Sequence, residues 1–148
     1  MHRQKSAKKQ VLGQMTKHGV EFVRLETLDL AGVVRCRVLR RNLLEKVFED
    51  GLNMSTAIFS FTVLEHMVPD PRWGPEDADF YMYPDVESFT VVPYLSKTAR
   101  MYSWLLDENG KIWEGDPRGH LDSLVAGLSR EGHRAQLAFE SEGYLMRK

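Results

Sequence analysis

The sequence of 148 residues predicts an α+β fold in which a mixed β-sheet is covered by packed helices. Helical spacing of apolar residues occurs in three stretches, and strand-like alternation of apolar and polar residues occurs between them. The elements follow one another in the order helix, hairpin, helix, several strands, helix and strand. A four- or five-stranded sheet with a helix packed across one face accommodates this order in two layers.

A helix and a hairpin are expected in the amino-terminal part. Apolar residues have helical spacing within residues 1–18, and a His-Gly pair follows as a stop. Residues 20–27 and 33–39 have strand patterns and flank a turn at 29–32 that contains glycine. Two strand patterns around such a turn predict an antiparallel hairpin.

The second strand of this hairpin carries Cys36, the only cysteine of the chain. Val34, Cys36 and Val38 alternate with Arg35 and Arg37, which predicts one apolar and one charged face. We therefore expect Cys36 to be a buried structural thiol. The flanking arginines offer the alternative of a thiol with a lowered pKa and higher reactivity. A single cysteine excludes an intramolecular disulfide and a cysteine-based zinc site.

A second helix and a long loop occupy the middle of the chain. Asn42 is a candidate N-cap for this helix, and Gly51 lies just past its end. Residues 52–75 have no periodicity, and loops longer than about 15 residues are usually functional or mobile. Strand patterns then return in four segments, 79–83, 88–93, 99–107 and 111–113.

The last part of the chain begins with a strong helix signal. Asp116 is a suitable cap and Pro117 a suitable first helical residue, and Gly132 closes the helix. The apolar stripe consists of Leu121, Leu124, Val125 and Leu128. Residues 134–145 follow with a strand pattern. Because this helix and strand have no obvious partners upstream, we expect a domain at 1–113 and the start of a second, truncated domain at 114–148.

Composition excludes several functional classes. Lys and Arg number 20 against 21 Asp and Glu, so no overall charge attracts nucleic acid or anionic lipid. The sequence has no apolar stretch near the roughly 18 residues that a membrane span needs, and no signal peptide follows Met1. We therefore expect a cytoplasmic protein with neither nucleic-acid nor membrane partners.

Glu140 and Glu142 are the candidate metal ligands. Residues two apart in a strand face the same side, about 7 Å from each other. Hard divalent ions take carboxylate oxygens, and such ions neutralise the phosphates of a nucleotide during phosphoryl transfer. Taken alone, however, the pair also fits the solvated face of an ordinary strand.

Five segments in order give the chain a resemblance to the glutamine synthetase family. They are the hairpin at 22–35 with its Asp-x-x-Gly turn, the stretch 79–93, Ala99-Arg100, Asp107 to Gly110, and Glu114-Gly115-Asp116-Pro117-Arg118 followed by a helix and the Glu-x-Glu pattern of 139–145. The resemblance covers residues 20–145. It implies a β-grasp-like amino-terminal domain joined to the first strand of a catalytic domain.

The resemblance also implies an activity. Family members use ATP to phosphorylate the γ-carboxylate of glutamate, and ammonia or another amine then displaces the phosphate. Glu140 and Glu142 match the two strand glutamates that bind Mg²⁺ or Mn²⁺. The family's subunits form homo-oligomeric rings with active sites between neighbours. Since the sequence ends before the family's catalytic domain, the chain alone is expected to be an inactive fragment.

Two departures and one alternative accompany this resemblance. Where the family's ammonia-using enzymes have an aspartate near the ammonium ion, residues 51–57 here contain Ser55 and no carboxylate, which favours a larger, less polar amine. Gly143 replaces an expected aromatic residue. The alternative function is a non-catalytic interaction module that docks to a synthetase-like ring, or to itself, through the loop at 52–75.

Overall fold

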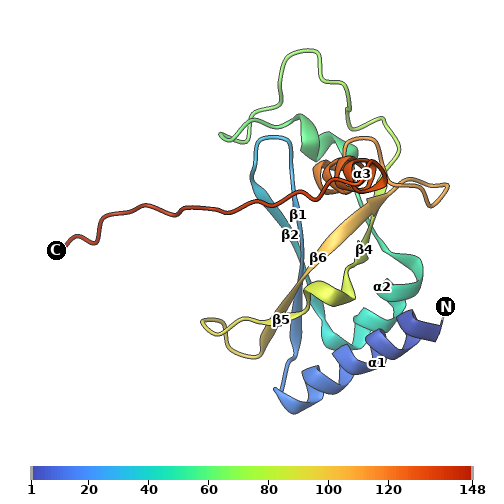
Figure 1. Cartoon of the computed structure of the whole chain (residues 1–148), viewed down its shortest axis with the longest axis vertical. Helices are drawn as coiled ribbons and strands as arrows, with labels where there is room; N and C mark the ends of the chain where they lie inside the picture. The colour runs from blue at the N-terminus through green and yellow to red at the C-terminus, as the bar shows by residue number, and fades with distance from the viewer. Residues whose placement is uncertain (1, 148) are drawn as a thin grey trace.

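The computed structural model describes residues 2–147, and its elements are shown in Figure 1. In chain order they are α1 (His2–Lys17), β1 (Phe22–Leu28), β2 (Val34–Arg40), α2 (Leu44–Asp50), β3 (Leu52–Met54), β4 (Phe80–Pro84), β5 (Thr90–Val91), β6 (Thr98–Leu106) and α3 (Pro117–Arg130). Three short 3₁₀ helices cover Arg41–Leu43, Thr56–Ser60 and Val86–Ser88. Within the described residues, no helix combines the length and the apolar character that crossing a membrane requires.

The strands form one curled, six-stranded sheet in the order β2-β1-β6-β4-β3, with β5 beside β6. β1 and β6 run parallel, whereas β6 is antiparallel to β4 and β1 is antiparallel to β2. The predicted α+β class with a mixed sheet and packed helices is therefore confirmed. β5 lies within the strand pattern expected at 88–93, whereas β3, of 3 residues, lies in the stretch 52–75 that was expected to be loop, because so short a strand shows no alternating pattern.

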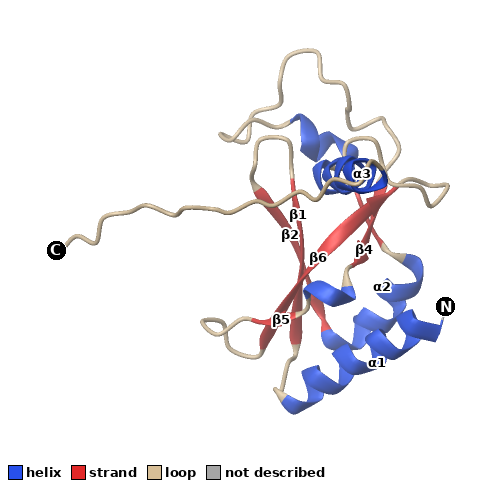
Figure 2. Ribbon diagram, in the orientation of Figure 1, coloured by secondary structure: helices blue, strands red, loops and turns tan. Residues whose placement is uncertain are grey.

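Two helices bury one face of the sheet. Val23 and Leu25 of β1 and Met101 of β6 are fully buried on this face, together with Met15 of α1 and Leu44 of α2. Figure 2 shows α1 and α2 near each other at one end of the sheet, where the Nζ of a lysine in α1 donates a hydrogen bond to a carbonyl at the end of α2. The core thus lies between these helices and the centre of the sheet.

The other side of the sheet carries charged and aromatic residues and is only partly covered. We call it the open face; it is made by Arg24, Glu26, Arg100, Tyr102 and Trp104. The parallel register places Arg24 beside Arg100 and Glu26 beside Tyr102. Glu26 is buried by its neighbours: Arg24 Nε lies 2.7 Å and Arg100 Nη1 3.8 Å from its carboxylate oxygens.

The prediction that Val34, Cys36 and Val38 face the core is wrong. Cys36 pairs with Glu26, so all three residues share the open face, where Val34 and Val38 are 53% and 59% exposed. Cys36 is free and half-buried. β2 is an edge strand, and its register on β1 decides which of its faces meets the core. As a result Leu39, one residue further along, is buried instead.

The predicted cap of the second helix is also wrong. Residues Arg41–Leu43 form a 3₁₀ turn, so Asn42 lies inside that turn rather than ahead of a helix. The N-cap of α2 is Leu43, which forms no side-chain cap hydrogen bond. Gly51 ends α2 as predicted, with a φ of 71° that suits glycine.

Candidate functional site

Asp116 anchors the turn that leads into α3. Its Oδ1 accepts a hydrogen bond from the N–H of Arg118 at 3.1 Å, which makes it the predicted helix cap. Its Oδ2 accepts from the N–H of Leu105 in β6 at 3.2 Å. Burial raises the pKa of Asp116, against the opposing effect of these backbone donors. The turn is therefore bonded directly to the central part of the sheet.

Arg118 attaches the first turn of α3 to the open face. Its Nη2 donates to the carboxylate of Asp85, which follows β4. The guanidinium carbon lies 3.9 Å from the centroid of the Trp104 ring and 5.8 Å from that of Tyr102. Contacts of this kind combine an ion pair with a cation–π interaction. Sequence reasoning missed Asp85 and Trp104 as partners, because neither lies near Arg118 along the chain.

Beyond its first turn, α3 has little contact with the rest of the molecule. Gly119 is the buried residue of the helix, and a Cβ at this position would lie 2.3 Å from the Cγ2 of Ile112. The apolar stripe predicted from the sequence forms, but Leu121, Leu124 and Leu128 are 52%, 55% and 41% exposed. α3 is therefore held mainly at its first turn, and most of its apolar stripe is exposed, although Val125 is half-buried beside a hollow that Val86 and Trp104 also line.

The predicted strand at 134–145 does not form in this chain. The residues that follow α3 have no helix or strand, and in Figure 1 they run as an extended segment away from the body. Phe139 and Tyr144 are 96% and 98% exposed. A strand needs hydrogen-bonding partners for its backbone, and the described residues supply none to this segment. Glu140 and Glu142 are exposed within it, and their role as metal ligands stays a prediction.

The donor set of these two glutamates fits a divalent ion in kind but not in number. Carboxylate oxygens suit Mg²⁺ and Mn²⁺, yet such ions take about six ligands. Among residues 2–147, no group of three or more His, Cys, Asp and Glu side chains is placed to hold a metal ion. Glu140 and Glu142 could therefore supply only part of a metal site, and other ligands must come from outside the described residues.

Ser55 caps a short helix at the start of the long loop. Its Oγ accepts a hydrogen bond from the N–H of Ala57 at 3.3 Å, which begins the 3₁₀ helix Thr56–Ser60. Neither Ser55 nor the residues just after it bear a charge. The hydroxyl of Ser55 thus has a local structural partner in the backbone.

The loop that follows is anchored by an aromatic cluster. Phe59 packs edge-on against Phe80 and Trp113, with ring centroids 5.4 and 4.8 Å away. Trp73 lies 4.8 Å from Trp113. The loop is therefore held to the sheet at both ends. Its tip remains apolar and exposed at Val63, Leu64, Met67 and Val68.

An ion-pair network that sequence reasoning did not predict joins this loop to the hairpin. Asp29 is buried in the hairpin turn, accepts from two backbone N–H groups, and pairs with Arg35 Nε at 2.7 Å. Arg35 Nη1 also lies 2.7 Å from Glu65 near the loop tip. The Asp-x-x-Gly spacing signalled the turn, but the pairing with Glu65 depends on tertiary structure.

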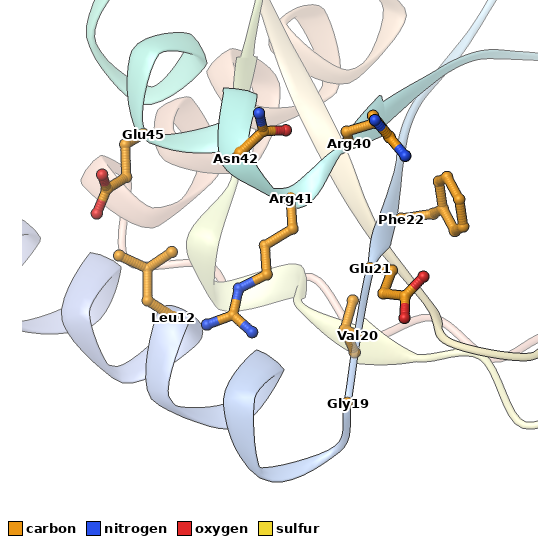
Figure 3. Close-up of a pocket in the computed structure, with 9 residues that line it drawn as sticks. All are labelled: Leu12, Gly19, Val20, Glu21, Phe22, Arg40, Arg41, Asn42 and Glu45. Carbon is orange, nitrogen blue, oxygen red and sulfur yellow. The ribbon is translucent and has the colours of Figure 1, made fainter.

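One hollow of the surface lies away from these residues. It has a volume of about 690 Å³ and is bounded by α1, the start of β1 and the segment after β2. In Figure 3 the side chain of Arg41 extends into it toward α1, where its Nη2 donates to Thr16 Oγ1 at 2.5 Å. None of the predicted site residues lines this hollow.

Known proteins with similar sequences include a γ-glutamylanilide synthase, a glutamate–isopropylamine ligase and several glutamine synthetases. The chain is 30% identical to a γ-glutamylanilide synthase of Acinetobacter sp over 97% of its length and 31% of that protein's. It is 29% identical to a glutamate–isopropylamine ligase of Pseudomonas sp, with 94% and 32% coverage. It is 27% identical to a glutamine synthetase of Halobacterium salinarum, with 93% and 29% coverage. No protein-family model matches the chain.

Two solved structures have a fold similar to that of this chain. A structure described as a novel glutamine synthase homolog is 26% identical, with a TM-score of 0.67 over 76% of this chain and 27% of that one. A complex of GmaS with ADP has a TM-score of 0.66 at 22% identity, over 82% and 26%. The chain spans about a third of the length of the curated relatives it matches. Together these similarities support a domain of the glutamine synthetase family.

Proposed function

We propose that this domain belongs to an ATP-dependent ligase that joins the γ-carboxylate of glutamate to an amine. The observation that carries the proposal is the similarity to a γ-glutamylanilide synthase along 97% of the chain. The chain spans 31% of that relative, and we propose that it supplies part of the active site and is inactive without the rest of the ligase. By the family resemblance, we place it at the amino-terminal side of the ligase, in a cytoplasmic homo-oligomeric ring.

The reaction has two steps. A γ-carboxylate oxygen of glutamate attacks the γ-phosphorus of ATP, so that ADP leaves and an acyl phosphate forms. The amine nitrogen then attacks the acyl carbon, inorganic phosphate leaves with the electrons of the broken C–O bond, and the nitrogen loses a proton. The description of the structural neighbour as an ADP complex agrees with the first step.

Glu140 and Glu142 are the residues of this chain that would hold a divalent ion. Bound Mg²⁺ or Mn²⁺ would neutralise charge on the transferred phosphoryl group. The two glutamates would provide oxygen ligands once the segment at 134–147 gains strand partners from the rest of the ligase. The exposed apolar residues of this segment and of α3 support such a partner, since they are covered by nothing among the described residues.

The acceptor is proposed to be an amine larger than ammonia. An ammonium ion needs a nearby negative charge to bind in a site of low polarity, and Ser55 offers only a neutral hydroxyl that already caps a helix. The names of two relatives, an anilide synthase and an isopropylamine ligase, point in the same direction.

A panel of amines tests both parts of the proposal. The full-length ligase should release phosphate from ATP only when glutamate and an amine are both present, and aniline or an alkylamine should surpass ammonia in kcat/KM. If ammonia is the best acceptor by far, the interpretation of Ser55 is wrong. If no amine supports phosphate release, the ligase proposal itself fails.

A non-catalytic interaction module is the second candidate. The exposed apolar loop tip at Val63, Leu64, Met67 and Val68 supports it, because such a patch suits protein contact. Sequencing the gene beyond codon 148 separates the two candidates. A stop codon there favours the module, whereas a reading frame that continues through a catalytic domain favours the ligase.

A further inference from the structure

We infer that Arg118 is a positioning residue, whose contacts with Asp85 and Trp104 set the direction of α3 and thereby place the Glu140–Glu142 segment. This inference rests on the proposed function for the role of the two glutamates. The contacts that attach α3 to the sheet region lie entirely within the described residues.

The argument starts from how α3 is attached. Asp116 and Gly119 hold its first turn, and the apolar stripe further along is exposed at Leu121, Leu124 and Leu128. Hollows of about 400 and 520 Å³ lie where the helix meets the sheet, and Arg118 lines both of them. The guanidinium between these hollows is therefore the long side chain that bridges the helix to the open face.

The contacts of Arg118 restrain direction as well as distance. The guanidinium carbon lies over the Trp104 ring, 3.9 Å from its centroid, and Nη2 pairs with Asp85, so that the group is held from two sides. Asp85 is itself held, because its Oδ1 accepts from the N–H of Glu87 at 3.1 Å. Arginine suits this role because its planar group both stacks and forms directional ion pairs.

Because α3 is attached at its first turn, a small tilt there produces a larger displacement at its far end. α3 has 14 residues, which at 1.5 Å per residue gives a length of about 21 Å. A tilt of about 3° at the first turn then moves the far end by about 1 Å, and a displacement of about 1 Å in an active site can reduce the rate about 100-fold. The segment with Glu140 and Glu142 leaves from this far end.

Distance measurements on the 148-residue chain test whether Arg118 fixes the direction of α3. Spin labels at Arg37→Cys in β2 and Ser129→Cys in α3, both exposed sites, in a Cys36→Ser background, would report the helix direction by double electron–electron resonance. Arg118→Met should broaden or shift the distance distribution by more than about 1 Å, which is the displacement calculated from the length and tilt of α3. Arg118→Lys, which keeps the charge but loses the flat stacking group, should give an intermediate result.

Arg100→Met is the matched control. Arg100 also lies on the open face, is similarly exposed, pairs with a carboxylate and lies 5.5 Å from the Tyr102 ring, but it is not part of α3. Its replacement should leave the label distances unchanged. An Arg118→Met distribution that matches the parent and the Arg100→Met chain would overturn the inference.

Kinetics of the full-length ligase test the consequence. Arg118→Met should lower kcat/KM about 100-fold and raise the Mn²⁺ concentration for half-maximal rate, while Arg100→Met changes neither. A moved helix with unchanged kinetics would refute the positioning role. Glu142→Gln, measured in the same assays, tests the metal role separately from the positioning role of Arg118. If this variant leaves the Mn²⁺ dependence unchanged, the metal role in the proposed function is wrong. The distance data then still decide whether Arg118 holds α3.

Discussion

Asp116→Ala should destabilise the chain by about 3 kcal/mol. Asp116 is 1% exposed, caps α3 and accepts the N–H of Leu105 from β6. Loss of a helix cap costs about 0.5–2 kcal/mol. A buried N–H left without an acceptor, here that of Leu105, costs about 1–3 kcal/mol more.

Urea unfolding followed by far-UV circular dichroism measures this effect. With a slope of about 2 kcal/mol per molar urea, the loss lowers the midpoint by about 1.5 M. Asp122→Ala is the matched control, because Asp122 is an exposed aspartate of the same helix, and its change should stay within about 0.5 kcal/mol. Equal midpoints for the two variants would show that the hydrogen bonds of Asp116 contribute nothing.

The pH dependence of the same residue adds an independent check. Burial raises the pKa of Asp116 above its ordinary value of 3.8, so the folded chain binds this proton more tightly than the unfolded chain. The contribution of this proton to the free energy of unfolding is fully present below pH 3.8 and is lost as the pH rises through the folded pKa. Asp116→Asn cannot titrate, so it should gain stability relative to the parent as the pH rises from 3.5 to 7. A constant difference across this range would contradict the raised pKa.

Three further predictions concern the core, the thiol and the metal ligands. Phe59→Ala, in the buried aromatic cluster, should cost about 3–5 kcal/mol in thermal unfolding, whereas Phe139→Ala, at a residue 96% exposed, should cost nothing measurable. Burial raises the pKa of the Cys36 thiol, so iodoacetamide at pH 8 should alkylate the folded chain more slowly than the urea-unfolded chain; equal rates would count against this. Glu142→Ala in the full-length ligase should abolish ATP-dependent ligation with an unchanged circular dichroism spectrum, and full activity would remove its assigned role.

The helices and the central strands could be predicted from the sequence, because their signals are local. The spacing of apolar residues placed α1 and α3, and Asp116-Pro117 marked the start of α3 correctly. Alternation placed β1 and β6. Each of these patterns depends on a few neighbouring residues, and the apolar residues of α1, β1 and β6 face the core that the tertiary structure builds.

The candidate site was predictable only in part, since its residues depend on contacts between distant segments. Arg118 stood out as part of a motif, yet its partners Asp85 and Trp104 come from other elements of the sheet region. Glu140 and Glu142 stood out by their spacing. Whether they meet a metal ion depends on strand partners that the described residues do not contain.

The amino-acid sequence by itself determined the fold class, the positions of the main helices and strands, and the family to which the resemblance pointed. Only the tertiary structure decided which face of β2 meets the core, where Asn42 lies, and how α3 is fastened. The physical reason is the range of the forces involved: propensity and periodicity act over a few residues, whereas the register of an edge strand and the partners of a buried charge are set by segments that meet only after the chain has folded.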